Sequence, residues 1–281
     1  MKIRLVLVIT FICLLYACAS NSLAGEEGGG AAEMARKLQD PLANVSAFMT
    51  DNDIQFKSGK EGDTTSYSFQ LQPVYAFDYP DHGFSFIPRA VIPIIGAASG
   101  SDLKFTGQTP ETDGTTWGMS DIVTQFFFAP KIEGSWKWGL GPQLSWKTRT
   151  DDNVGGPGWG AGLSGVLVGS VTKQLSFAGI INQLWSYDGD YSTMGFQPNF
   201  YYNLESVEGA FIAYNSTITA NWKADSSDIW TVPIGVFAGR MFDLGGGYGM
   251  EVGLGPYWNI VKPDGAADWF LKFQINFMLP K

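Results

Sequence analysis

The residue types that usually carry enzymatic chemistry are few in this chain, and they do not cluster. Its one histidine, His82, lies in the turn-like stretch Asp81-His82-Gly83. A serine hydrolase needs such a base beside a nucleophilic serine, and a zinc site needs further histidine or cysteine ligands. The sequence contains neither a P-loop nor a nucleophile elbow. We therefore expect no enzyme, with no catalytic residue, no metal site and no cofactor.

Polar side chains of another kind recur at every other position within otherwise apolar segments. Side chains that alternate in this way lie on one face of a β-strand. If the more apolar set of each segment forms the outer face, the inner set is rich in carboxamides and carries both charges. We predict that its members line or constrict a lumen: Arg89, Asp121, Lys137, Gln143, Lys147, Gln197, Asn199, Glu251, Lys272 and Gln274, with Gln70, Gln72, Gln125, Asn215 and Asn221 on the same face.

Three members of this inner set, Arg89, Glu251 and Lys272, are ionisable groups inside strand-like segments. Charged groups at membrane depth are costly unless they face water or one another. They therefore either form a constriction that selects solutes or form internal salt bridges that close the barrel and conduct nothing. The sequence leaves both interpretations open.

The last segment, Trp269 to Lys281, is the clearest of the elements that must position these side chains. Its odd-numbered positions from Leu271 to Leu279 are apolar, and polar residues lie between most of them. Similar segments of about the length of a tilted membrane strand occur at residues 66–77, 84–95, 119–128, 136–148, 159–170, 175–185, 194–203, 210–222, 229–242 and 248–261. Because bacterial barrels have an even number of strands, we place one more in residues 45–56. The predicted fold class is all-β, a transmembrane antiparallel β-barrel of about 12 strands over residues 45–281.

The N-terminal segment has the pattern of an export signal. Lys2 and Arg4 precede an apolar run that is too short to span a bilayer, and small residues precede Ala24. We predict that residues 1–24 are a signal peptide cleaved after Ala24, with lipidation at Cys18 as the alternative. Cleavage leaves 16 of the 18 basic residues against 27 acidic ones. That balance argues against nucleic acid as a partner.

Residues 25–44 are predicted to be a periplasmic lead-in. A short helix beginning at residue 31 should be stopped by Pro41. It caps the periplasmic mouth, enters the lumen, or forms a loosely held lead-in.

The connections sort into two classes. If the last strand runs down into the periplasm, the extracellular connections are residues 57–65, 96–118, 149–158, 186–193, 223–228 and 262–268, and the other five are short. Eight of the ten tryptophans lie beside the long connections, where an amphipathic ring suits a membrane interface. A belt of Phe and Tyr is expected at the other end: Phe77, Tyr79, Phe84, Phe177, Tyr202, Phe211, Phe242, Tyr248 and Phe277.

A soluble sandwich, the alternative, predicts no such sorting. We therefore predict a location in the bacterial outer membrane. The expected partners are outer-membrane lipid and lipopolysaccharide, the barrel-assembly machinery and a small-molecule solute.

Two further features need an explanation. Seven prolines lie inside predicted strands, and we interpret them as bulged or widely spaced positions that curve the wall: Pro73, Pro88, Pro93, Pro142, Pro198, Pro233 and Pro256. Every long connection carries acidic residues. These either hold divalent cations and attract cationic solutes, or are present because Asp suits turns.

Four segments resemble those of a known family: Met49-Thr-Asp-Asn-Asp-Ile-Gln-Phe56, Leu184-Trp-Ser-Tyr-Asp-Gly-Asp190, Ile218-Thr-Ala-Asn-Trp-Lys-Ala-Asp225 and Trp258-Asn-Ile-Val-Lys-Pro-Asp-Gly265. They are similar to segments of bacterial outer-membrane proteins named for the meta-pathway of phenol degradation, some of which carry a neuromedin U label. The resemblance implies an outer-membrane barrel that admits aromatic or other small apolar compounds, and it carries over no functional residue.

With the polar inner set, we expect a channel or transporter for small molecules. The alternative is a non-conducting structural or surface-binding barrel with acidic extracellular loops.

Overall fold

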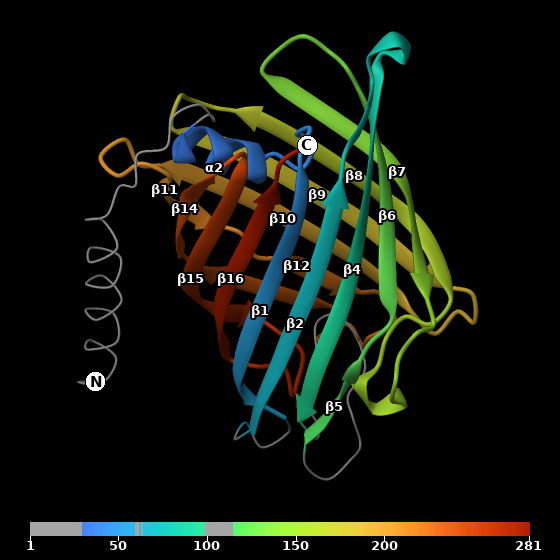
Figure 1. Cartoon of the computed structure of the whole chain (residues 1–281). Helices are drawn as coiled ribbons and strands as arrows, with labels where there is room; N and C mark the ends of the chain where they lie inside the picture. The colour runs from blue at the N-terminus through green and yellow to red at the C-terminus, as the bar shows by residue number, and fades with distance from the viewer. Residues whose placement is uncertain (1–29, 60–61, 63, 99–114) are drawn as a thin grey trace, which may run out of the picture.

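The strands of this chain close into one antiparallel barrel (Figure 1). The computed structural model describes residues 30–59, 62, 64–98 and 115–281. Its elements are α2 (Ala31–Gln39), β1 (Ser46–Ser58), β2 (Thr64–Tyr75), β3 (Phe77–Tyr79), η2 (Pro80–His82), β4 (Phe84–Ala98), β5 (Thr115–Met119), β6 (Ile122–Pro130), β7 (Trp136–Trp146), η3 (Asp152–Val154), β8 (Gly160–Ser170), β9 (Leu175–Ser186), β10 (Ser192–Asn203), β11 (Ala210–Tyr214), β12 (Ile218–Asn221), β13 (Trp230–Gly235), β14 (Phe237–Gly245), β15 (Tyr248–Val261) and β16 (Trp269–Leu279). The last strand, β16, pairs with the first, β1, and closes the sheet.

Four of the barrel strands are interrupted within the wall. β2 continues into β3, β5 into β6, β11 into β12 and β13 into β14, and both parts of each strand pair with the same neighbour. The sixteen strand segments are therefore twelve barrel strands. This confirms the predicted number, and β1 begins in the stretch where the additional strand was predicted, residues 45–56, and extends two residues beyond it. The short N-terminal helix, α2, is also confirmed, and it ends two residues before Pro41.

The two ends of the barrel differ in their connections. At one end, which we call the short-turn end, lie α2, the C-terminus and tight turns such as that between β14 and β15 (top of Figure 1). At the other, the long-loop end, β1, β4, β7, β9, β12 and β15 end. This is the predicted sorting of long and short connections. The predicted signal peptide, residues 1–24, and residues 99–114 lie outside the described residues.

The outer face of the barrel is apolar and aromatic. In β16, Ile275 and Phe277 are exposed, whereas Lys272 and Asn276 are buried on the inner side, as the alternation predicts. Seven of the eight tryptophans predicted at the long-loop end are exposed: Trp117, Trp146, Trp159, Trp185, Trp222, Trp230 and Trp258.

One residue of the predicted aromatic belt is placed differently. Phe211 is only 2% exposed and points inward. Its ring packs over Gly239 of the neighbouring strand, where an added Cβ would lie 2.5 Å from a ring carbon. The expectation of an outward Phe211 was wrong because the glycine opposite it leaves room for the ring inside the barrel.

The strand prolines lie where backbone pairing is interrupted on one side. Pro73 of β2 pairs with Phe48 of β1, and Pro88 of β4 pairs with Phe126 of β6. Neither is paired in the ladder between β2 and β4. Pro142, Pro198 and Pro256 likewise have a ladder partner on one side only. A proline has no N–H to donate, so these one-sided positions accommodate it without opening the barrel.

Part of the barrel interior is filled by side chains. Phe211, Phe237, Tyr257 and Phe270 form a buried cluster inside β11, β14, β15 and β16. At the short-turn end, Met34, Ala35 and Leu38 of α2 pack against Met241, Met278 and the first residues of β1. The helix thus lies in the short-turn mouth and is held there by apolar contacts, which excludes a loosely held lead-in.

No helix in the described part of the chain is long and apolar enough to cross a membrane.

Candidate functional site

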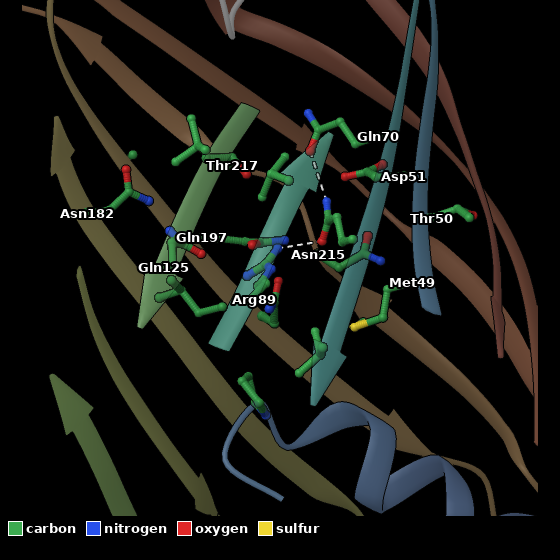
Figure 2. Close-up of a pocket in the computed structure, with 18 of the residues that line it drawn as sticks. Met49, Thr50, Asp51, Gln70, Arg89, Gln125, Asn182, Gln197, Asn215 and Thr217 are labelled. Atoms are coloured by element: carbon green, nitrogen blue, oxygen red, sulfur yellow. Dashed lines mark hydrogen bonds between the residues drawn. The ribbon is translucent and has the colours of Figure 1, made fainter. Parts of the chain in front are cut away.

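A cavity of about 220 Å³ lies inside the barrel between the two ends. Leu38, Gln39 and Pro41 form its floor at the short-turn end, and Asp121, Pro157 and Tyr191 line it toward the long-loop end. Its walls come from strands β1, β2, β4, β6, β7, β9, β10, β12, β15 and β16 and from the β11–β12 break. Figure 2 shows these side chains converging above α2.

Seven of the ten predicted lumen candidates line this cavity: Arg89, Asp121, Gln143, Gln197, Asn199, Glu251 and Gln274. Lys137, Lys147 and Lys272 do not. Lys137 lies at the short-turn end, where its Nζ is 2.7 Å from Oδ2 of Asp40. Lys147 is exposed just beyond the other end of β7. Alternation along the strand assigned both lysines to the inner face, but it could not show that Lys147 lies beyond the end of β7 or how high along the barrel the cavity lies.

Lys272 is buried within the barrel in a network of ion pairs. Its ammonium contacts Oδ1 of Asp51 and lies 3.2 Å from Oδ1 of Asp53, and its side chain is 1% exposed. A buried cation of this kind is stable only with such partners. For Lys272, therefore, the structure agrees with the alternative of an internal salt bridge that closes the wall between β1 and β16. Of its two partners, Asp51 also lines the cavity.

Glu251 and Arg89 differ from Lys272 because both line the cavity. Glu251 accepts a hydrogen bond from Nδ2 of Asn276 at 2.8 Å. Arg89 donates through Nη2 to the carboxamide oxygen of Gln72, which in turn donates to Gln70 at 2.9 Å. In Figure 2 the bonds that link Arg89 through Gln72 to Gln70 are drawn as dashed lines. No carboxylate among the described residues forms an ion pair with Arg89.

Asp121 positions the connection between β7 and β8. Its carboxylate is 2.8 Å from Nη2 of Arg149 and accepts backbone N–H bonds from Thr148, Arg149 and Gly158. Val154 of the same connection packs against Ile95 and Ala97 inside the wall. The connection is therefore folded into the long-loop mouth, and Asp121 is an anchor for it as well as a lining residue.

The apolar part of the lining was not anticipated from the sequence. Ile87, Val91, Phe127, Ile180 and Leu184 face the cavity together with the carboxamides. Assigning the more apolar set of each strand to the outer face hides such residues, because strands buried on both faces are apolar on both faces. Asp51 was also missed, since the irregular sequence of β1 gave no clear sidedness.

The described parts of the acidic loops show no arrangement suited to a cation. No group of three potential metal ligands occurs in the described part of the chain. Several of the acids stabilise their own turns. Asp151 accepts the N–H of Asn153 at 2.8 Å, and hydrogen bonds from Ser186 and the N–H of Asp190 lower the pKa of Asp188. Turn formation explains these acids without a ligand.

His82 lies far from the cavity. It occupies η2 at the tip of the β3–β4 hairpin, which projects beyond the short-turn mouth in Figure 1, and its ring centroid is 6.5 Å from that of Phe84.

Known proteins match this chain by structure rather than by sequence. Neither a family model nor a curated protein matches it. The crystal structure of the COG4313 outer membrane channel from Pseudomonas putida F1 superposes with a TM-score of 0.61 at 13% identity, covering 91% of this chain and 100% of that one. The NanC porin superposes with a TM-score of 0.50 at 12% identity, covering 83% and 100% of the two chains. The chain thus shares the β-barrel fold of these outer-membrane proteins.

Proposed function

We propose that this protein is an outer-membrane channel or transporter for small molecules. The observation that carries the proposal is the cavity inside the closed barrel, which extends from the inward-folded β7–β8 connection to α2 and has both polar and apolar walls. An apolar outer face with aromatic residues near both ends suits a bilayer. The two similar structures, an outer membrane channel and a porin, support the same function.

The substrates we propose are small aromatic or other apolar compounds. The mixture of polar and apolar side chains in the lining supports this class of substrate. A purely polar pore would not bind the apolar body of such a molecule and would exclude it. The resemblance of four segments to the phenol-degradation family points the same way. We further propose a periplasmic short-turn end, cleavage after Ala24, and insertion into lipid and lipopolysaccharide by the barrel-assembly machinery.

The test is flux through the purified full-length barrel in lipid vesicles. Vesicles that contain the protein should become permeable to a small polar solute such as arabinose, which crosses lipid only slowly, and planar bilayers that contain it should conduct small ions. Vesicles reconstituted with heat-denatured protein are the control. A folded barrel that passes neither would contradict the proposal.

A second function is favoured by one specific observation. Apolar contacts hold α2 in the short-turn mouth and aromatic side chains fill part of the interior. A barrel closed in this way would be a structural or surface-binding protein that conducts nothing. The same recordings decide between the two, since the alternative predicts no current from any folded preparation.

A further inference from the structure

Three polar side chains form a row across one wall of the cavity. Arg89 on β4 is the register partner of Gln125 on β6, and Gln125 is the register partner of Gln143 on β7. All three point inward and line the cavity, and Figure 2 shows Arg89 and Gln125 side by side. Directly opposite residues in an antiparallel pair have Cβ atoms about 5 Å apart, so the row is one continuous polar surface.

Each member of the row has a polar atom without a protein partner. These atoms are Nε of Arg89, Oε1 of Gln125 and Nε2 of Gln143. Gln125 and Gln143 are 5% and 1% exposed and are joined by one hydrogen bond of 3.2 Å. Exchanging the O and N atoms of both carboxamides reverses that bond but again leaves one donor and one acceptor free. Buried polar groups are rarely left unpaired, so the row is suited to a ligand.

The charge of the row indicates which ligand. Arg89 has only the neutral oxygen of Gln72 as a hydrogen-bond partner among the described residues. Of the other acidic groups lining the same part of the cavity, Asp51 is paired with Lys272 and also attracts Arg89 electrostatically, and Glu251 accepts a hydrogen bond from Asn276. A buried guanidinium is strongly stabilised by a carboxylate that accepts its N–H groups.

The surroundings of the row indicate the rest of the ligand. Ile87 and Phe127 lie on its short-turn side, and Val91 and Val123 lie on its long-loop side, on the same strands two residues away. Ile87 and Phe127 are each 1% exposed. A molecule whose acid group reaches the row would therefore place its body against apolar side chains on either side.

We propose that the row Arg89, Gln125 and Gln143 binds the carboxylate of a small apolar acid, with Nε of Arg89 and a carboxamide N–H of the row as its donors. This inference deepens the proposed function, on which it rests, by naming the substrate class. Benzoate is the probe, and benzyl alcohol is the neutral molecule of similar size.

The test is equilibrium binding of benzoate to the purified full-length protein in detergent, measured by calorimetry. Arg89→Gln should weaken benzoate binding at least about tenfold, the loss expected for a charge-assisted hydrogen bond, and should change benzyl alcohol binding less than about twofold. Arg240→Gln is the matched control, because Arg240 is on the outer-face parity of β14, beside Phe242, and its loss removes the same charge. Unchanged benzoate affinity in Arg89→Gln would overturn the proposal, as would an equal loss for both probes.

A second variant guards against misfolding of the first. Gln125→Glu places a carboxylate opposite Arg89, where it takes the position of the ligand and restores a charge pair. This variant should fold and should lose benzoate binding to the same extent, whereas a wild-type affinity would contradict the site. Binding is measured without any membrane, so a barrel that binds benzoate but passes no solute would refute the channel alone. One that passes neutral solutes but does not bind benzoate would refute this site alone.

Discussion

At the residue scale, the buried side chain of Lys272 forms ion pairs with two aspartates, Asp51 and Asp53. Replacing Lys272 by methionine keeps most of the side-chain volume but leaves Asp51 and Asp53 without their cation. We expect the free energy of unfolding to fall by about 3–5 kcal/mol, the typical cost of breaking a buried pair by removing one partner. Urea unfolding in detergent, followed by tryptophan fluorescence, measures it.

Lys57→Met is the control for that measurement. Nζ of Lys57 lies 3.5 Å from Oδ2 of Asp268, and the side chain of Lys57 is 62% exposed. Exposed pairs contribute about 0–1 kcal/mol, so the control should unfold almost like the wild type. Equal stability of Lys272→Met and Lys57→Met would show that the buried pair does not hold the wall together.

At the scale of the elements, two glycines of β7 differ in how closely the atoms of neighbouring residues approach them. An added Cβ at Gly141 would lie 1.6 Å from the carbonyl oxygen of Phe126, which is backbone and cannot move aside. At Gly139 the nearest atom is a methyl of Leu42 at 3.1 Å, which is flexible. We expect Gly141→Ala to destabilise the barrel by about 1–3 kcal/mol or more, as overpacking does. Gly139→Ala should cost clearly less in the same urea titration, and the reverse order would contradict this picture of the wall.

The helix α2 is the second element with a testable role. Met34 and Leu38 are 4% and 6% exposed and hold it in the short-turn mouth. The double substitution Met34→Asp and Leu38→Asp places two charges in that apolar contact, which should release the helix and raise the single-channel conductance severalfold. Ala32→Asp adds a charge on the exposed face of α2 and should leave the current unchanged. A wild-type current from a folded double variant would mean that α2 does not restrict passage.

At the scale of the whole molecule, the orientation of the barrel can be tested with single cysteines. Both natural cysteines, Cys13 and Cys18, lie in the predicted leader. Asp190→Cys lies in a long-loop connection and Glu133→Cys in a short turn, and both positions are exposed. We expect a membrane-impermeant maleimide to label Asp190→Cys on intact cells and Glu133→Cys only after lysis. The opposite pattern would mean that the short-turn end faces outward, and the wild-type chain reports background labelling.

The sequence by itself determined the strands, their number and the face that most of the polar strand side chains occupy. Alternation with a period of two is a local property of an extended backbone, so Lys272 and Gln274 could be assigned to the inner face from β16 alone. The same holds for the long and short connections and for the end at which most tryptophans lie. The sequence also showed which prolines lie inside the strands. It did not show which of the two neighbouring strands each proline fails to pair with.

Only the tertiary structure decided which inner residues meet. Lys137 and Gln143 share one face of β7, and Lys147 follows the strand with the same parity, yet only Gln143 lines the cavity, because the height of the cavity depends on α2 below it and the β7–β8 connection above it. Phe211 points inward because Gly239 on another strand leaves it space. The row of Arg89, Gln125 and Gln143 exists only through the register of three strands. Register, barrel closure and side-chain volume are properties of several segments together, and no single segment of the sequence contains them.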